Sequence, residues 1–171
     1  NIIKEHIFPN NHLGIDKIES IVSESSGSSI DLSDLYIQYT TVESWSCEDG
    51  IVKNGSQHID SGYGIRAISN EKTGFSYGNN FDFDEIIKAA KLSKSIVKSN
   101  ISQSLNLKEY TDFKKLYISE SPLTSVSDNS KVDFLKEMNR YIKNKDKRVQ
   151  QVIINLSASH DSVFVANSLG T

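Results

Sequence analysis

Apolar positions along the chain change from a helical spacing to strict alternation within the first forty residues. The segment "NHLGIDKIESIVSES" repeats its apolar residues close to the helical period, and Gly27 follows it. From Asp34 onward apolar and polar residues alternate and β-branched residues are frequent, which is typical of half-buried strands. The pattern therefore predicts a helix near residues 11–26 and an antiparallel sheet built from residues 34–77.

Turn signals divide this sheet region into short strands. Two-residue turn sequences stand at Asp49-Gly50 and at Asn54-Gly55, and a polar turn follows at Asn70-Glu71-Lys72. Together they predict a meander of about four antiparallel strands.

The helical period returns in two later segments. Asp82 is placed to cap a helix over 82–98, with Glu85 three residues later in a capping-box arrangement. Ser130 is placed to cap a second helix over 130–144. The apolar face of the second helix is predicted to comprise Val132, Leu135, Met138 and Ile142.

The remaining segments are a long connection and a carboxyl-terminal strand pair. Residues 99–129 are polar and serine-rich, and they predict an irregular connection. The last segment predicts a hairpin that turns near His160-Asp161. The expected fold class is α+β, an antiparallel β meander packed against helices and ending in a further β hairpin. The predicted core consists of Leu35, Ile37, Trp45, Ile65, Ile68, Phe75, Ile87, Leu135, Met138, Ile153 and Val163.

Composition narrows the classes of function. The chain has 171 residues, enough for one domain with a real core, and a net charge of −3, which argues against nucleic-acid binding. The opening "NIIKEHIFPN" carries charged residues among its apolar ones, so it is neither a signal peptide nor a membrane span. The single cysteine suits a reducing compartment. These features predict a cytoplasmic protein that does not bind membranes.

The sequence "SGYGIRAISN" raises the question of nucleotide binding. Gly62, Gly64 and Ala67 have the G-x-G-x-x-A spacing of a dinucleotide-binding turn. That turn must join a strand to a helix, whereas here a second strand-like run, "TGFSY", follows. Glycine within a strand instead marks a place where another backbone or a ligand comes close. Gly62, Gly64 and Arg66 are therefore the candidate substrate-binding residues.

Side chains suited to catalysis are scattered. His6, His12, His58 and His160 form no H-x-x-x-H or H-E-x-x-H pair, so no local metal site is predicted. Cys47 stands beside acidic residues, which argues against a nucleophilic role. The carboxylates that could form an acid–base pair are Glu43, Glu48, Asp49 and Asp60, although acidic residues at strand ends are usually only solvated. No catalytic residue is assigned within the chain.

A family resemblance rests on several long segments in a fixed order. "ESW", "EDGIVKNGS", "GYGIRAIS" and "EKTGFSY", followed by "DKRVQQVIINLSASHDSVFVANSLGT", resemble the amino-terminal domain of the TldD/TldE (PmbA) metallopeptidase family. "EKTGFSY" favours its TldD-like branch. The resemblance covers nearly the whole chain, and the family has also been called a modulator of DNA gyrase.

The resemblance implies a cytoplasmic, zinc-dependent peptidase that acts with a TldE-like partner on unfolded or extended polypeptides. The family's H-E-x-x-x-H metal helix belongs to a carboxyl-terminal domain, and this sequence does not contain it. Residues 1–171 are therefore expected to form the amino-terminal domain of a longer protein and to be inactive alone. A non-catalytic module that binds polypeptides or a partner remains the alternative.

Overall fold

The computed structural model describes residues 14–97 and 120–170. The chain divides into two compact units. The described residues of unit 1 are 14–39, 61–97 and 162–170, and those of unit 2 are 40–60 and 120–161.

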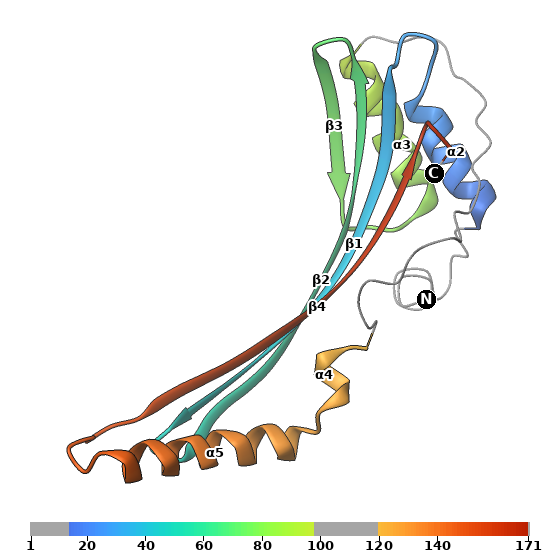
Figure 1. Cartoon of the computed structure of the whole chain (residues 1–171). Helices are drawn as coiled ribbons and strands as arrows, with labels where there is room; N and C mark the ends of the chain where they lie inside the picture. Colours follow the sequence, from blue (N-terminus) through green and yellow to red (C-terminus); the bar gives the residue numbers. More distant parts are fainter. Residues whose placement is uncertain (1–13, 98–119, 171) are drawn as a thin grey trace. The chain divides into compact units, whose positions relative to one another are not determined.

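Among the described residues, four strands form one sheet in the order β3-β2-β1-β4. The strands are β1 (Leu32–Glu48), β2 (Ile51–Ser69), β3 (Lys72–Gly78) and β4 (Ile153–Asn167). The helices are α2 (Ile15–Ser25), α3 (Phe83–Ile96), α4 (Pro122–Ser125) and α5 (Asp128–Lys145) (Figure 1). The predicted α+β class and the antiparallel β meander are confirmed.

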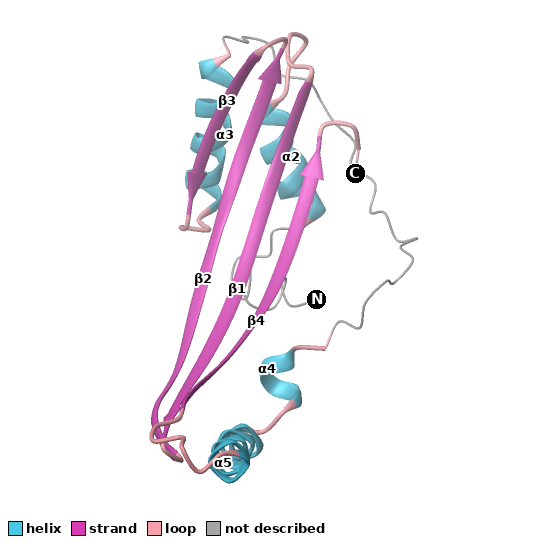
Figure 2. Cartoon of the chain, turned by 60° about the vertical axis from the view of Figure 1, so that its left-hand side comes forward, coloured by secondary structure: helices cyan, strands magenta, loops and turns pink. Residues whose placement is uncertain are grey.

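The core of unit 1 lies between one face of the sheet and two helices. Successive side chains of a strand point to opposite faces, so the odd-numbered residues of β1 and β2 lie together. Leu35, Ile37 and Ile65 are fully buried on this face, where α2 and α3 cover the sheet (Figure 2). Ile21 of α2 and Ile86 of α3 complete the apolar layer.

Two predicted turns are confirmed by their backbone conformation. Asp49 and Gly50 join β1 to β2 with φ values of 48° and 81°. Positive φ at both central residues is what a tight hairpin with the twist of its strands requires. Asn70, with a φ of 52°, begins the turn between β2 and β3.

The predicted helices are present with small changes at their ends. The side chain of Asp82 caps α3 by accepting hydrogen bonds from the backbone N–H groups of Asp84 and Glu85. The second predicted helix begins earlier than expected, because Ser127 rather than Ser130 is its cap. Residues 11–13, 98 and the connection over 99–119 lie outside the described residues.

Three predictions about the strands were wrong. The Asn54-Gly55 pair is not a turn, because β2 continues through it and the meander has three strands rather than four. Gly55 instead makes room for a side chain, since an added Cβ would lie 2.8 Å from the ring of Trp45. The predicted hairpin at His160-Asp161 is one continuous strand, β4, in which Asp161 accepts a hydrogen bond from Thr40.

The predicted core was correct in part. Leu35, Ile37, Ile65 and Leu135 are fully buried. The partly buried members are Trp45, Ile68, Ile87 and Met138. Phe75, Ile153 and Val163 are exposed, because they occupy strand positions whose side chains point away from the helices.

Candidate functional site

The free edge of β3 is the feature of unit 1 best suited to bind an extended chain. β3 pairs with β2 on one side only and is the margin of the sheet in the described part of the chain (Figure 2). A strand in this position presents unpaired N–H and C=O groups to a further strand. Proteins commonly protect such edges with charges or proline, yet β3 carries only Lys72, at its first residue.

Helix α3 lies directly against one face of β3. The Ser76 hydroxyl donates a 2.6 Å hydrogen bond to the carbonyl of Ala89. At Gly74 the helix is so close that an added Cβ would stand 1.9 Å from the carbonyl oxygen of Ser93. This contact requires glycine at position 74 and fixes α3 on the strand.

Two aromatic side chains stand on the opposite face of β3. Phe75 and Tyr77 alternate with Gly74 and Ser76, so they point away from α3. Their rings are stacked with centroids 6.1 Å apart, and the two residues are 55% and 80% exposed. Exposed aromatic residues side by side on a sheet edge are available for contacts with another strand.

The flank of α3 beside Gly74 is apolar as well. Ile96 is the side chain nearest to Gly74 on that helix, because an added Cβ there would lie 3.1 Å from the Ile96 Cβ. Leu92 precedes Ile96 by one helical turn on the same flank. The two are 56% and 51% exposed, in chain order. Exposed apolar side chains thus stand on both faces of the β3 edge.

The predicted site residues lie on β2, next to β3. Gly64 is paired with Tyr77, and a Cβ there would meet the Phe75 ring at 3.0 Å. A Cβ on Gly62 would lie 3.1 Å from the carbonyl oxygen of Gly78. The prediction that these glycines belong to a strand is confirmed, and the close neighbour at each is the chain's own β3. That they bind substrate stays a prediction.

Arg66 is held by an ion pair on the face of the sheet opposite α2 and α3. It is opposite Phe75 in the β2–β3 register, and its Nη2 lies 2.5 Å from the Asp34 Oδ2. Its Nε donates a second hydrogen bond of 3.0 Å to the same oxygen. The charge is therefore largely satisfied within the sheet.

Tyr63 of β2 is paired with Gly78, at the carboxyl end of β3. The residue is buried and meets the ring of Phe81 edge-on, with centroids 5.8 Å apart. Burial, and to a lesser extent the charge of Glu85, raises the pKa of the Tyr63 phenol. The phenol therefore stays neutral at physiological pH and acts as a packing group.

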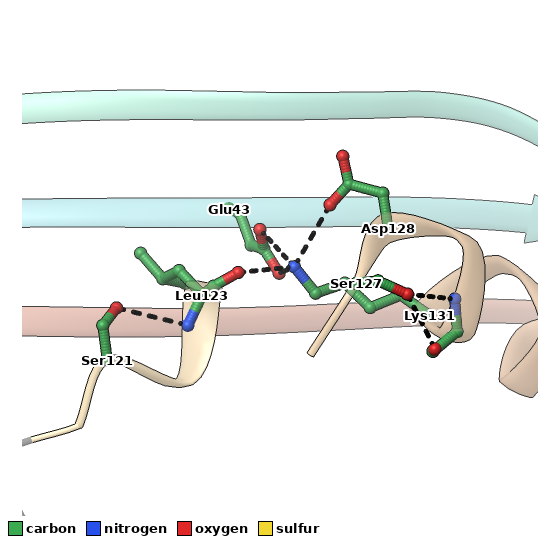
Figure 3. Close-up of polar contacts among 7 residues, drawn as sticks. Glu43, Ser121, Leu123, Ser127, Asp128 and Lys131 are labelled. Atoms are coloured by element: carbon green, nitrogen blue, oxygen red, sulfur yellow. Dashed lines mark hydrogen bonds and ion pairs between the residues drawn. The ribbon is translucent and has the colours of Figure 1, made fainter. Parts of the chain in front are cut away.

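Unit 2 contains a buried ion pair between a helix and a strand. Lys131 of α5 and Glu43 of β1 have side chains only 5% and 10% exposed. The Lys131 Nζ lies 2.7 Å and 2.9 Å from the two Glu43 carboxylate oxygens (Figure 3). It also donates to the Leu123 carbonyl at 2.9 Å and lies 3.4 Å from the Asp128 Oδ1. The hydrogen bond to Glu43 is the main reason that the pKa of Lys131 is raised.

The other carboxylates singled out from the sequence have separate partners. Asp49 pairs with Lys143 at 2.7 Å, a contact that lowers the pKa of Asp49. Glu48 accepts a hydrogen bond from Gln151 and lies 3.9 Å from Lys53, while Asp60 is exposed. The four carboxylates are not brought together as an acid–base pair.

Metal-ligating side chains are dispersed as well. Cys47 is fully buried in β1, whereas His58 is exposed in β2. Across residues 14–97 and 120–170, no three His, Cys, Asp or Glu side chains form a group that could hold a metal ion. His6 and His12 lie outside these ranges. The described residues therefore do not fit a catalytic zinc site.

In the described parts of the chain, no helix is both long enough and apolar enough to cross a bilayer.

Comparison with protein families identifies the chain. Residues 33–97 match PmbA/TldA metallopeptidase domain 1, and residues 121–171 match the central domain of the same family. The chain belongs to the PmbA/TldD metallopeptidase family. The predicted family resemblance is thereby confirmed.

Curated relatives in this family are named metalloprotease TldD homologues. The chain is 31% identical to one from Buchnera aphidicola subsp. Schizaphis graminum, over 99% of this chain and 35% of that protein. It is also 31% identical to one from Haemophilus influenzae, over 100% of this chain and 36% of that protein. The chain thus spans about a third of the length of these PmbA/TldD relatives.

Solved structures share the fold. A proposed modulator of DNA gyrase from Bacteroides thetaiotaomicron aligns with a TM-score of 0.67 and 16% identity, covering 91% of this chain and 37% of that one. TldE from Thermococcus kodakarensis aligns with a TM-score of 0.61 and 17% identity, covering 90% and 35%. At these identities the likeness supports the PmbA/TldD fold.

The family matches and the compact units divide the chain differently. Glu43 lies within the domain 1 match, yet it belongs to unit 2 together with Lys131 of the central-domain match.

Sequence reasoning missed Lys131 because a lysine near the start of a helix is ordinarily solvated. The only available signal was that Lys131 and Leu135 are four residues apart, on the face of α5 that is buried.

Proposed function

We propose that this chain is the amino-terminal portion of a TldD-like metallopeptidase and that it binds extended polypeptide substrates along the free edge of β3. Family membership and the identity to metalloproteases named TldD support the peptidase part of the proposal. In this proposal the catalytic zinc and the general base are supplied by other parts of the parent protein. A TldE-like subunit is the proposed partner, and the cytoplasm is the proposed location.

The exposed apolar side chains on both faces of the β3 edge are the main support for the proposed binding role. A strand added along this edge would meet Phe75 and Tyr77 on one face and Leu92 and Ile96 on the other. Its backbone would pair with the groups of β3 that face away from β2. An unfolded polypeptide can supply both kinds of contact along its length, whereas most backbone groups of a folded substrate are already paired.

Backbone pairing of this kind predicts broad sequence tolerance. Main-chain hydrogen bonds are the same for every residue type except proline, so affinity depends little on the exact sequence. The aromatic pair adds a preference for aromatic or β-branched residues at alternate substrate positions. Substrate positions between these face α3. Because α3 comes close to β3 at Gly74 and Ser76, there is less room for large side chains on this face.

The predicted residues Gly62, Gly64 and Arg66 take a supporting role in this proposal. Gly64 allows the Phe75 ring to lie against the sheet, and Gly62 allows the β3 backbone to come close. Arg66 is opposite Phe75 in the register and is held by Asp34. These residues would shape the binding edge from the β2 side.

The binding role is tested with an unstructured peptide of alternating valine and threonine that carries a fluorophore. We expect saturable binding to the 171-residue chain by fluorescence anisotropy, with slowed amide exchange at residues 72–78. Tyr77→Lys should weaken binding at least tenfold, because it places a charge beside the added strand. Lys91→Glu, a surface change on α3, serves as the matched control and should leave affinity within twofold.

An N-methylated version of the peptide separates backbone pairing from side-chain contact. Methylation of alternate amides removes hydrogen-bond donors without changing the side chains, so binding should be lost. Equal affinity for both peptides, or protection at β4 instead of β3, would contradict the proposed site. Binding at β3 by a parent protein that cleaves nothing would favour a non-catalytic module.

A further inference from the structure

Helix α4 is too short to be stable by its own hydrogen bonds. It comprises only the four residues Pro122–Ser125, whereas isolated helices need about 12–15 residues to be even marginal in water. Its amino end is capped by the Ser121 hydroxyl, which accepts from the Leu123 N–H. Its carbonyl groups cannot all find partners within so short a helix. The order of α4 must therefore come from contacts with other elements.

Lys131 provides such a contact from α5. Its ammonium donates to the Leu123 carbonyl while it is anchored by the Glu43 carboxylate on β1 (Figure 3). The Leu123 side chain is also buried. One buried cation thus links three elements, with Glu43 and Lys131 separated by 88 positions in the chain.

The geometry shows why Glu43 matters more than Asp128 to this arrangement. Glu43 offers two oxygens within 2.9 Å and is buried beside Lys131. Asp128 is 3.4 Å away and its side chain is 74% exposed. If the Glu43 charge is removed, the exposed Asp128 is the carboxylate that still lies beside the ammonium. The ammonium would then turn toward Asp128 and leave the Leu123 carbonyl.

We propose that the Lys131–Glu43 pair is a latch that holds α4 on β1. The order of residues 121–126 then depends on a carboxylate in a distant strand, and release of the latch frees α4 while α5 stays on the sheet. Because the central-domain match begins at residue 121, the latch fastens the first element of that match to a strand of the domain 1 match. The latch does not depend on the proposed peptidase role.

Hydrogen exchange of the 171-residue chain tests the latch through Glu43→Gln. We expect the amides of residues 123–126 to exchange at least tenfold faster than in the wild type. Amides of α5 over residues 134–142 should stay within twofold, because Leu135 and Asn139 remain buried in both proteins. Lys143→Met, which breaks the half-exposed pair with Asp49 in the same unit, is the matched control and should change neither segment.

A second variant keeps the test decisive if Glu43→Gln fails to fold. The double variant Glu43→Leu/Lys131→Met replaces both charges by apolar groups, which buried sites often tolerate. It lacks the donor to the Leu123 carbonyl, so exchange at residues 123–126 should again rise at least tenfold. Unchanged exchange at α4 in either folded variant, or an equal rise along all of α5, would overturn the proposal.

Discussion

Gly74→Ala should destabilise unit 1 by about 3 kcal/mol, the upper end of the usual cost of overpacking. The added Cβ would stand 1.9 Å from the Ser93 carbonyl oxygen, 2.9 Å from the carbonyl carbon and 3.1 Å from the Ile96 Cβ. The first two atoms belong to the backbone of α3 and cannot turn aside, so the whole helix must move away from the sheet. Urea unfolding followed by far-UV circular dichroism measures this loss.

Gly64→Ala is the matched control for Gly74→Ala. Its added Cβ would meet only the Phe75 ring at 3.0 Å, and that ring is exposed and free to turn. The cost should therefore stay within about 1 kcal/mol. A Gly74→Ala protein as stable as the Gly64→Ala protein would show that α3 does not lie directly on β3.

Lys131→Met should destabilise unit 2 by about 3 kcal/mol, because it leaves the Glu43 carboxylate buried without its cation. Trp45 is the chain's single tryptophan and belongs to unit 2, so its fluorescence during urea unfolding reports on this unit. Lys143→Met is the control and should cost clearly less than Lys131→Met, since the Lys143–Asp49 pair is half exposed and screened by solvent. Equal losses in the two variants would contradict the buried character of the Lys131 pair.

The effect of Lys131→Met should not vary between pH 6 and pH 9. Glu43 and Asp128 raise the pKa of Lys131 above its ordinary value of 10.5. A raised pKa in the folded state contributes stability that is complete below the unfolded pKa and is lost as the pH rises through the folded one. The lysine contribution should therefore decline only above about pH 10.5.

Local signals in the sequence located the helices and the turns at Asp49-Gly50 and Asn70 well. The Asp49-Gly50 turn and the Asp82 cap depend on residues that are adjacent or nearly so, and both were correct. Leu35, Ile37 and Ile65 were correctly predicted in the core because alternate positions of a strand share one face. Interactions between residues close in the sequence were thus sufficient to predict these features.

Features that depend on distant residues could not be predicted. Asn54-Gly55 has the sequence of a turn, yet its glycine accommodates the Trp45 ring of the neighbouring strand. Phe75 has a typical core side chain but lies on the face of β3 opposite α3. Lys131 and Asn139 are polar residues buried in the face of α5 that packs on the sheet, where apolar spacing had predicted Met138 and Ile142.

The candidate site was only partly visible in the sequence. Gly62, Gly64 and Arg66 were singled out from local spacing, and they do adjoin β3. The edge itself follows from the strand order, which a single sequence does not reveal. The apolar flank formed by Leu92 and Ile96 depends on how α3 crosses β3, a contact set by the absence of a side chain at Gly74.

The most direct test of the central claim is the steady-state kinetics of the intact parent protein, assembled with a TldE-like subunit, on an unstructured peptide. Our account predicts chelator-sensitive cleavage, with Tyr77→Lys raising KM at least tenfold while kcat stays within twofold, because the residue contributes to substrate binding and not to the chemistry. Lys91→Glu in the same assembly should leave both constants unchanged. Cleavage by the Tyr77→Lys parent with an unaltered KM would contradict the assignment of the β3 edge as the polypeptide-binding site.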